Sequence, residues 1–517
     1  MHIILRFTIL FVLFLSGFCI AQNNFSNPIF FDRKGTETNI FSIQDSIKKP
    51  NVFFDKLRNK TINIGTGRIT DGEQFQKEPT FQALLSPIFK TEIGYDTYKK
   101  AMANELGIGA KLNLNYKNKI VFSAAVFQSN ATFNSYYDSV ITKTNMVPFA
   151  GYAHGLANNH FYYWNNSFSL SYKAGKYLVF SFANAKNFLG DGYRSLLLSN
   201  NANNYPHLKI DANIWKFKYT AIFSNLYDIR LSNGNFNNYN YKYASMHYFK
   251  WQVFKKLELS FYEAIIFQSR KQKGFGYDIN YLNPFIFYRP VEYSLGSSDN
   301  AILGGNLKFN YKPNITIYAQ FVLDEFYVSR VRERKGWIDN KQGVQLGVKG
   351  YKTFGKHHFN FLAEVNYVRP YVYSHGNALQ NYSNFNMPLA HPFGANFYEV
   401  LAMIKYKSLN YMQINATISY ALIGYDKGGV SYGQNINESY ALRVIRKDDN
   451  GSFVGQGLQT KQLLLFTNAI FAINKTNNTC LSVGLMLRHT ANELGNKFIA
   501  YPHIGFSTLV FGDGGIF

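Results

Sequence analysis

Cysteine is scarce in this chain, which has only Cys19 and Cys480 among its 517 residues. Cys19 lies in an N-terminal segment that we expect to be removed on export, which leaves Cys480 alone. No intrachain disulfide is then available. A single thiol in the apolar run that begins at Cys480 is expected to be a small packing residue and not a nucleophile.

Long apolar runs are also missing. After the first 21 residues, no uncharged apolar run reaches the length that a membrane-spanning helix needs. Stretches rich in Ala, Glu and Leu, which are typical of long helices, do not occur either. If the protein lies in a membrane, it must therefore cross with strands that close into a barrel.

The sequence lacks the common motifs of catalysis and of nucleic-acid binding. It has no Gly-x-Ser-x-Gly elbow, His-Glu-x-x-His site, Walker loop, zinc-finger spacing or RNP-like motif. The net charge of +23 suits nucleic acid, anionic lipid or acidic polysaccharide, and export argues against nucleic acid. We therefore expect no enzyme, no cofactor and no metal site.

The N-terminal residues predict export. Residues 1–21 combine Arg6, a short apolar core and small residues before Gln22, as in a secretory signal peptide. Lipidation at Cys19 is an alternative that the bulky Phe18 disfavours. Residues 22–80 are polar and turn-rich, and we interpret them as a periplasmic lead segment that forms either a small plug or a disordered tail.

In many segments of residues 81–517, apolar and polar side chains alternate along the chain. In 314–326, Ile317 and Phe321 share one face, and Tyr318 and Gln320 share the other. The runs 358–369 and 410–421 alternate in the same way. Aromatic residues make up 18% of the chain and charged residues 16%, which favours strands with one apolar wall and one polar wall.

Short and long connections interleave between these segments. Short turns fall at sites such as Lys255-Lys256, and long loops fall at about 133–159, 187–205, 229–239, 271–301, 328–341, 370–395 and 423–459. This pattern predicts an all-β fold: an antiparallel transmembrane barrel of about 18 strands, with short periplasmic turns and long extracellular loops. A soluble solenoid or propeller is the alternative, but the sequence has no repeat of composition.

The loop at 187–205 contains two glycines around Asp191, followed by Tyr193 and Arg194. One interpretation is a folded loop that presents Tyr193 and Arg194 to a glycan, because tyrosine stacks on sugars and arginine grips carboxylates. The other is a loop packed into the lumen, with Arg194 paired to an inward carboxylate.

Further candidate glycan contacts are basic and aromatic residues near the outer loops. They are Arg289, Glu292, Tyr293, Arg330, Arg332, Arg334, Arg369 and Tyr371. Four acids on strands are candidate lumen carboxylates with a structural or a binding role: Glu263, Asp324, Glu364 and Glu399. Glu263 does not fit simple alternation, so we expect either a nearby bulge or a shifted register that turns it into the lumen.

Several of these motifs together resemble the capsule-assembly Wzi family, and most closely its branch labelled gliding-motility protein RemB. The resemblance rests on Gly190-Asp191-Gly192-Tyr193-Arg194-Ser195-Leu196-Leu197-Leu198-Ser199, Asn283-Pro284, Arg289-Pro290-Val291-Glu292-Tyr293, Leu323-Asp324-Glu325-Phe326 and Arg369-Pro370-Tyr371. It implies a large outer-membrane barrel whose extracellular loops bind surface polysaccharide, without catalysis and without export through a channel.

We therefore expect an outer-membrane protein that anchors surface polysaccharide, with a link to gliding motility implied by the branch alone. Its expected partners are this polysaccharide, outer-membrane lipids and the barrel-assembly machinery. A porin-like passive channel for small solutes is the alternative, because polar side chains would line the lumen.

Overall fold

The computed structural model of the protein describes residues 81–155, 159–268, 276–284, 299–325, 328–408, 412–443, 449–474 and 479–508. The predicted signal peptide and the predicted lead segment at 22–80 lie outside these residues. The same holds for three candidate glycan contacts, Arg289, Glu292 and Tyr293.

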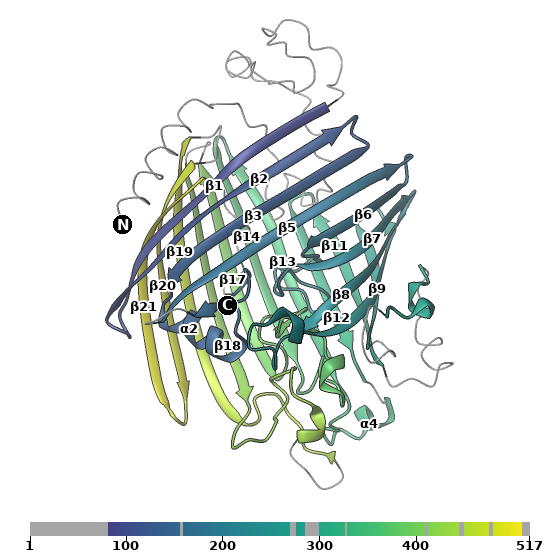
Figure 1. The fold of residues 1–517 in the computed structure, drawn as a ribbon. Helices are drawn as coiled ribbons and strands as arrows, with labels where there is room; N and C mark the ends of the chain where they lie inside the picture. Colours follow the sequence, from purple (N-terminus) through teal and green to yellow (C-terminus); the bar gives the residue numbers. More distant parts are fainter. Residues whose placement is uncertain are drawn as a thin grey trace, which may run out of the picture.

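In the described part of the chain, 18 antiparallel strands close into a single barrel, as the sequence predicts (Figure 1). These strands are β1 (Phe81–Asp96), β2 (Ala101–Tyr116), β3 (Ile120–Thr132), β5 (His160–Ala174), β6 (Leu178–Ala185), β7 (Tyr205–Ile214), β8 (Phe217–Asp228), β9 (Asn240–Phe254), β10 (Leu257–Phe267), β11 (Asn300–Lys312), β12 (Ile315–Leu323), β13 (Gln342–Phe354), β14 (His357–Val368), β17 (Phe397–Ser408), β18 (Met412–Tyr425), β19 (Leu458–Asn474), β20 (Thr479–Asn492) and β21 (Gly495–Ser507). Neighbours in sequence pair with one another, and β1 pairs with β21 through Lys90 to Gly94 to close the barrel.

Short elements lie in the connections. They are β4 (His154–Gly155), β15 (Ser383–Asn384), β16 (Met387–Pro388), α2 (Ser135–Thr144), α4 (Val328–Arg332), η3 (Phe236–Asn238), η4 (Ile279–Leu282), η5 (Ala378–Gln380) and η6 (Tyr440–Leu442). In the described residues, no helix is long and apolar enough to cross a membrane.

The two walls of each strand face the environments that the alternation predicts. On β12, Ile317 and Phe321 are 37% and 45% exposed on the outside, whereas Tyr318 and Gln320 are buried in the lumen. The outer wall is therefore the apolar one, as in a membrane barrel and unlike a soluble barrel.

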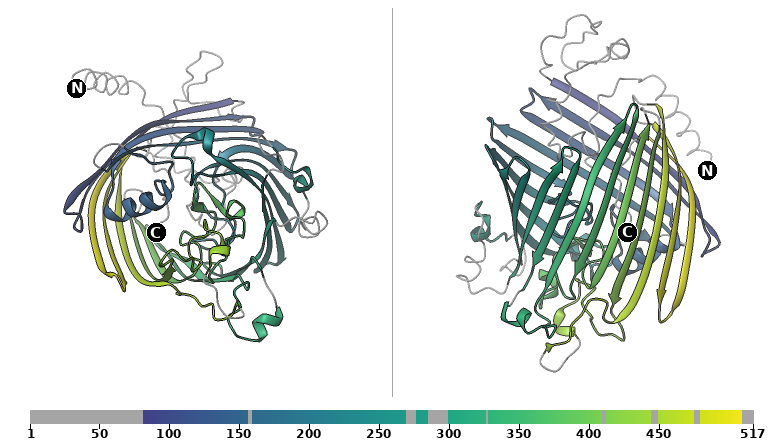
Figure 2. Two further views of the ribbon diagram at one scale, coloured as in Figure 1. Left: turned by 60° about the horizontal axis from the view of Figure 1, so that its bottom comes forward. Right: turned by 180° about the vertical axis from the view of Figure 1, so that it is seen from behind.

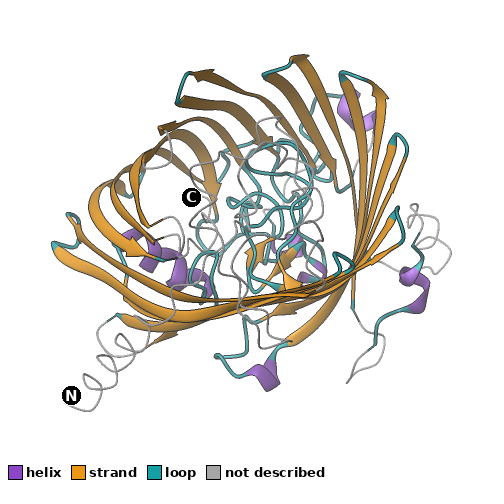
Figure 3. Ribbon diagram, turned by 90° about the horizontal axis from the view of Figure 1, so that it is seen from above, coloured by secondary structure: helices purple, strands orange, loops and turns teal. Residues whose placement is uncertain are grey.

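Most connections differ in length at the two ends of the barrel, as predicted, although those from β1 to β2 and from β20 to β21 are short at the end where the others are long. At one end, β7 and β8 are joined through Trp215 and Lys216, and β9 and β10 through Lys255 and Lys256. At the other end, the connections that precede β7, β17 and β19 are long and fold back into the barrel (Figures 2 and 3). The wall therefore encloses a plug of loops.

Candidate functional site

The connection between β6 and β7, residues 186–204, forms the centre of the plug. Leu196, Leu197 and Leu198 are fully buried in the largest apolar cluster of the protein. The backbone nitrogen of Leu189 donates to the carbonyl of Leu198 at 2.9 Å, which closes the loop on itself. The three leucines therefore pack in an apolar cluster inside the lumen, together with inward apolar residues of the wall such as Ile302 and Val322.

Inward polar side chains of three strands hold the backbone of this loop. Glu364 on β14 accepts hydrogen bonds from the backbone nitrogens of Tyr193 at 2.7 Å and Arg194 at 3.3 Å. Gln320 on β12 accepts one from Leu196 at 3.0 Å, and Gln345 on β13 donates to the carbonyl of Arg194. These wall residues bind backbone groups that would otherwise be buried without partners.

The two glycines of the loop are required by close approach to the wall. A Cβ atom on Gly192 would lie 2.3 Å from Oε1 of Gln345 and 2.7 Å from Oε2 of Glu364. Gly190 has φ +130°, a backbone conformation that side chains rarely adopt, and its Cβ would overlap Gln320. The glycines of the motif thus fit the loop to the inner wall.

Arg194 is a buried residue at the centre of a charged network. Its Nη1 lies 3.2 Å from Oε1 of Glu399 on β17, and its guanidinium lies over the ring of Phe393 at 5.3 Å. Glu399 also bonds Nε2 of His391 at 2.9 Å and accepts from Ser419 at 2.8 Å. Arg194 is 4% exposed, so the interpretation in which this loop presents it to the outside is wrong and the lumen-packed alternative describes its position.

His391 and Arg194 belong to different loops, and Glu399 joins both to the wall. Burial lowers the pKa of His391 to about 4, and the neighbouring Glu399 carboxylate only partly opposes this effect. The imidazole is therefore neutral at neutral pH. Sequence patterns did not single out His391, because a lone histidine in a long loop has no spacing that marks it.

Asp191 fixes the part of the loop that meets three lysines on the wall. Its carboxylate lies 3.3 Å from Nζ of Lys308 and 3.8 Å from Nζ of Lys349, and it accepts from Asn306 at 2.7 Å. Burial acts to raise the pKa of Asp191, but Lys250, Lys308 and Lys349 outweigh it and hold this pKa well below its usual range. Asp191 is therefore an ionised tether between loop and wall.

The connection between β14 and β17, residues 369–396, packs against the first loop. Asp324 accepts from the backbone nitrogen of Tyr373 at 2.7 Å, and the Tyr373 hydroxyl donates to the carbonyl of Leu196 at 2.7 Å. Tyr382 donates in the same way to Leu197 at 2.9 Å. Tyr371 is buried, and its hydroxyl donates to the carbonyl of Ser431 at 2.9 Å.

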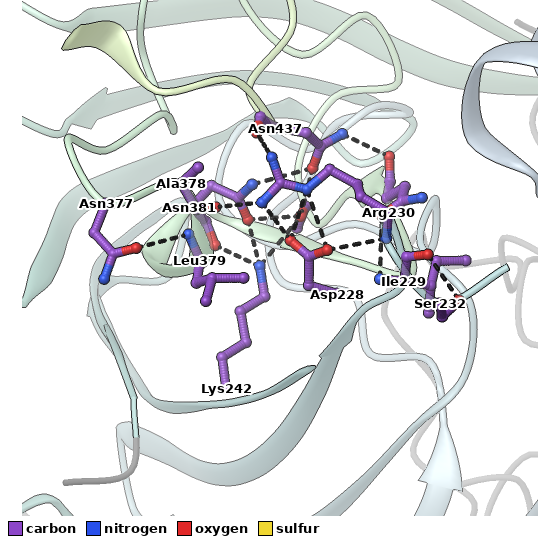
Figure 4. Close-up of polar contacts among 12 residues, drawn as sticks. Asp228, Ile229, Arg230, Ser232, Lys242, Asn377, Ala378, Leu379, Asn381 and Asn437 are labelled. Carbon is purple, nitrogen blue, oxygen red and sulfur yellow. Dashed lines mark hydrogen bonds and ion pairs between the residues drawn. The ribbon is translucent and has the colours of Figure 1, made fainter. Parts of the chain in front are cut away.

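A polar cluster ties this loop to two others near the mouth (Figure 4). Lys242 donates to the carbonyl of Asn381 at 2.9 Å, and Asn381 donates to Oδ1 of Asn437 at 3.1 Å. Arg230 pairs with Asp228 at 2.6 Å and also donates to the carbonyl of Asn437. Residues of β8 and β9 are thereby fixed to the long connections that follow β8, β14 and β18.

The exposed part of the site is the outer rim, which we define as residues 330–337 and 449–453. Two backbone bonds join these segments, from Gly451 to Lys335 at 2.7 Å and from Ser452 to Gly336 at 2.9 Å. Arg369 lies beneath and donates to the carbonyl of Trp337 at 3.0 Å. The outer rim is therefore an ordered surface and not a set of independent loops.

The chemistry of the outer rim is basic and aromatic. The Arg330 guanidinium lies over the Trp337 ring at 4.5 Å and also pairs with Glu333 at 3.3 Å. Arg332, Arg334 and Lys335 are exposed. Such a surface can bind an anionic sugar by charge, and its aromatic residues can stack on the sugar ring.

Glu263 does not face the lumen, contrary to the expectation from sequence. The register of β10 shifts against β9 only between Leu257 and Glu258, near the short turn. Pairing with β11 is continuous past Glu263, so this residue keeps the outward direction of Phe261. It is nevertheless buried, beside His247 of β9.

The wall glutamines and asparagines that hold the plug were not singled out from the sequence. Gln320, Gln345, Asn306 and Asn366 are all buried and bonded. Their inward position on alternating strands was the one available signal. In the described residues, no group of three or more His, Cys, Asp or Glu side chains could hold a metal ion.

The sequence matches no protein-family model and no curated protein. The fold, however, is similar to that of Wzi from Escherichia coli, a carbohydrate-binding β-barrel of the outer membrane involved in group 1 capsule assembly. The two chains are 12% identical with a TM-score of 0.52, over 82% of this chain and 84% of Wzi. The resemblance to Wzi is thus confirmed at the level of the fold.

Other similar structures are Pseudomonas aeruginosa barrels. OprD has a TM-score of 0.42 at 9% identity, over 82% of this chain and 94% of OprD. OpdK has a TM-score of 0.42 at 8% identity, over 82% and 98%. The fold of the protein described here is that of an outer-membrane barrel, as in Wzi.

Proposed function

We propose that this protein is a non-catalytic outer-membrane barrel that binds an acidic surface polysaccharide at its outer rim. The plug is the main support for this proposal, because the loops that fill the lumen also hold the outer rim in a fixed shape. A preorganised surface binds with less loss of conformational freedom than a mobile one.

Charge on the outer rim supports an acidic ligand. Arg330, Arg332, Arg334 and Lys335 lie within one short segment, with Glu333 as the acid among them. Arginine binds carboxylates through two parallel hydrogen bonds, and uronic acids of polysaccharides offer such groups. The fold shared with Wzi, which is named as carbohydrate-binding, supports the same proposal.

Binding by purified barrel in detergent tests this function directly. The triple variant Arg330→Ala, Arg332→Ala, Arg334→Ala is expected to weaken binding of an acidic polysaccharide about tenfold or more, and to reduce its dependence on salt. The matched control removes three lysines at the opposite end, by Lys255→Ala, Lys256→Ala and Lys356→Ala. Equal loss in both variants would contradict the assignment to the outer rim.

A porin-like channel is the second candidate, and one observation favours it. The inner wall carries lysines where it meets the plug, among them Lys250, Lys308 and Lys349. A passage lined by such side chains would suit small anionic solutes. Steady conductance of the purified wild-type barrel in a planar bilayer would favour this candidate over a closed anchor.

The resemblance to the RemB branch leads us to a finer proposal, that the anchored polysaccharide supports gliding motility. Deletion of the gene should then reduce spreading on a surface without reducing growth. Unchanged spreading would remove motility from the account and leave polysaccharide binding untouched.

A further inference from the structure

Part of the connection between β10 and β11 lies outside the barrel. We call its described part, residues 276–284, the outer flap. The η4 turn of the outer flap lies beside β9 on the outside of the wall (Figures 1 and 3). Its Tyr277 ring lies 5.3 Å from the ring of Tyr243 and 5.0 Å from that of Phe267.

Hydrogen bonds from two strands fix the outer flap to the wall. Ser245 on β9 donates to the carbonyl of Tyr281 at 2.6 Å. Tyr219 on β8 donates to the carbonyl of Pro284. In the other direction, the backbone nitrogen of Gly276 donates to the Tyr243 hydroxyl at 3.3 Å. The outer flap is therefore a bound element of the wall.

Polar side chains near the outer flap point away from the lumen. On β10, Tyr262 bonds the hydroxyl of Tyr382 in the lumen, so Phe261 and Glu263 point outward. Phe261 is 49% exposed, whereas Glu263 is 3% exposed. His247 on β9 faces it, with Nδ1 3.9 Å from Oε2 of Glu263, and is fully buried.

Glu263 and His247 form a buried polar patch on the outside of the wall. This patch lies at the height of the lipid-facing belt. Leu303 pairs with Glu263 on the next strand and is 41% exposed. Leu208 pairs with Phe223 on the other side of the patch and is 53% exposed. Glu263 lies roughly 18 Å along the barrel axis from the short turn, inside a belt about 25 Å tall.

We propose that the outer flap is a lipid-facing element which binds acyl chains of the outer leaflet. Ile279 and Leu282 are its contact residues, because both are exposed and continue the apolar belt formed by Leu208 and Leu303. The outer flap thereby shields Ser245, His247 and Glu263 from hydrocarbon, where a polar or charged side chain is strongly unfavourable. It is a surface for lipid, although it belongs to a connection at the extracellular end.

Spin labelling of the mature, purified barrel in phosphatidylcholine vesicles tests this proposal. A nitroxide is attached at Ile279→Cys in a Cys480→Ser background, and its collisions with oxygen and with a water-soluble nickel chelate are compared. We expect oxygen collisions to exceed nickel collisions several-fold. A label at Leu231→Cys, on the exposed loop after β8, is the control and should favour nickel.

Two results would overturn the proposal. Nickel accessibility at position 279 equal to that at 231 would place the outer flap in water. Protection from both reagents would mean that protein, such as a second copy of the barrel, covers it instead of lipid. A label at Leu282→Cys gives the same readout if the first variant does not assemble, and neither result bears on polysaccharide binding.

Discussion

Single residues decide how the plug is held, and the Arg194–Glu399–His391 network shows why. A buried carboxylate is stabilised by its cation and its hydrogen-bond donors together, so removal of the acid leaves a guanidinium buried without its counter-charge. We expect Glu399→Ala to lower the free energy of unfolding by about 3–5 kcal/mol.

The control for this change is Ser419→Ala, which removes one hydrogen bond to the same carboxylate and should cost about 1 kcal/mol. Thermal or denaturant unfolding of both variants in detergent provides the comparison. Equal effects of the two substitutions would contradict a charge-dependent role of Glu399.

Gly192 lies so close to the wall that a larger residue should destabilise the plug. In Gly192→Ala the new Cβ would meet Gln345 and Glu364, and such overpacking destabilises by about 1–3 kcal/mol. Gly155→Ala is the matched control, because a Cβ there meets nothing within 4 Å. The free energy of unfolding should fall for the first variant and stay within about 0.5 kcal/mol for the second.

At the scale of elements, the loops of the plug should loosen in mild acid. Burial lowers the pKa of His391 to about 4 from its ordinary 6.5, so the unfolded chain binds more protons between these values. The stability that His391 contributes is therefore complete above about pH 6.5. It is lost as the pH falls toward 4, by up to about 3 kcal/mol.

The unfolding midpoint measured at pH 7 and at pH 5 checks this expectation. The difference between the midpoints at pH 7 and pH 5 should be smaller in His391→Gln, because glutamine cannot take up the proton. Asp191 loses its contribution to stability in a lower pH range. Its pKa is depressed in the folded protein, so this contribution is lost only below about pH 4. An unchanged pH difference in the variant would assign the effect to another group.

The elements of the wall could be predicted from the sequence because alternation is local. The sequence of each strand by itself indicates which side chains share a face, as Ile317 and Gln320 on β12 illustrate. Long loops carry no such period, so the partners of Arg194 and the folding of residues 369–396 into the lumen depend on contacts distant in sequence. Glu263 also follows the alternation, because it shares the outward side of Phe261, and the expectation that it turns into the lumen was wrong.

At the scale of the whole molecule, the plug should keep the barrel closed. The wild-type protein is expected to show no steady conductance in a planar bilayer. Replacement of residues 188–203 by four glycines should open one, because Ala185 and Tyr205 already pair across the hairpin and the wall can remain intact. Circular dichroism of the variant controls for the strand content. Steady conductance of the wild type would contradict a closed lumen.

Retention of polysaccharide by cells tests directly whether the outer rim anchors it. A deletion strain is complemented with the wild type, with the Arg330, Arg332 and Arg334 triple alanine variant, or with the Lys255, Lys256 and Lys356 control, and cell-bound and shed polysaccharide are measured. We expect the outer-rim variant to shed polysaccharide while total synthesis and the control remain unchanged. Equal retention by all three proteins would contradict this expectation.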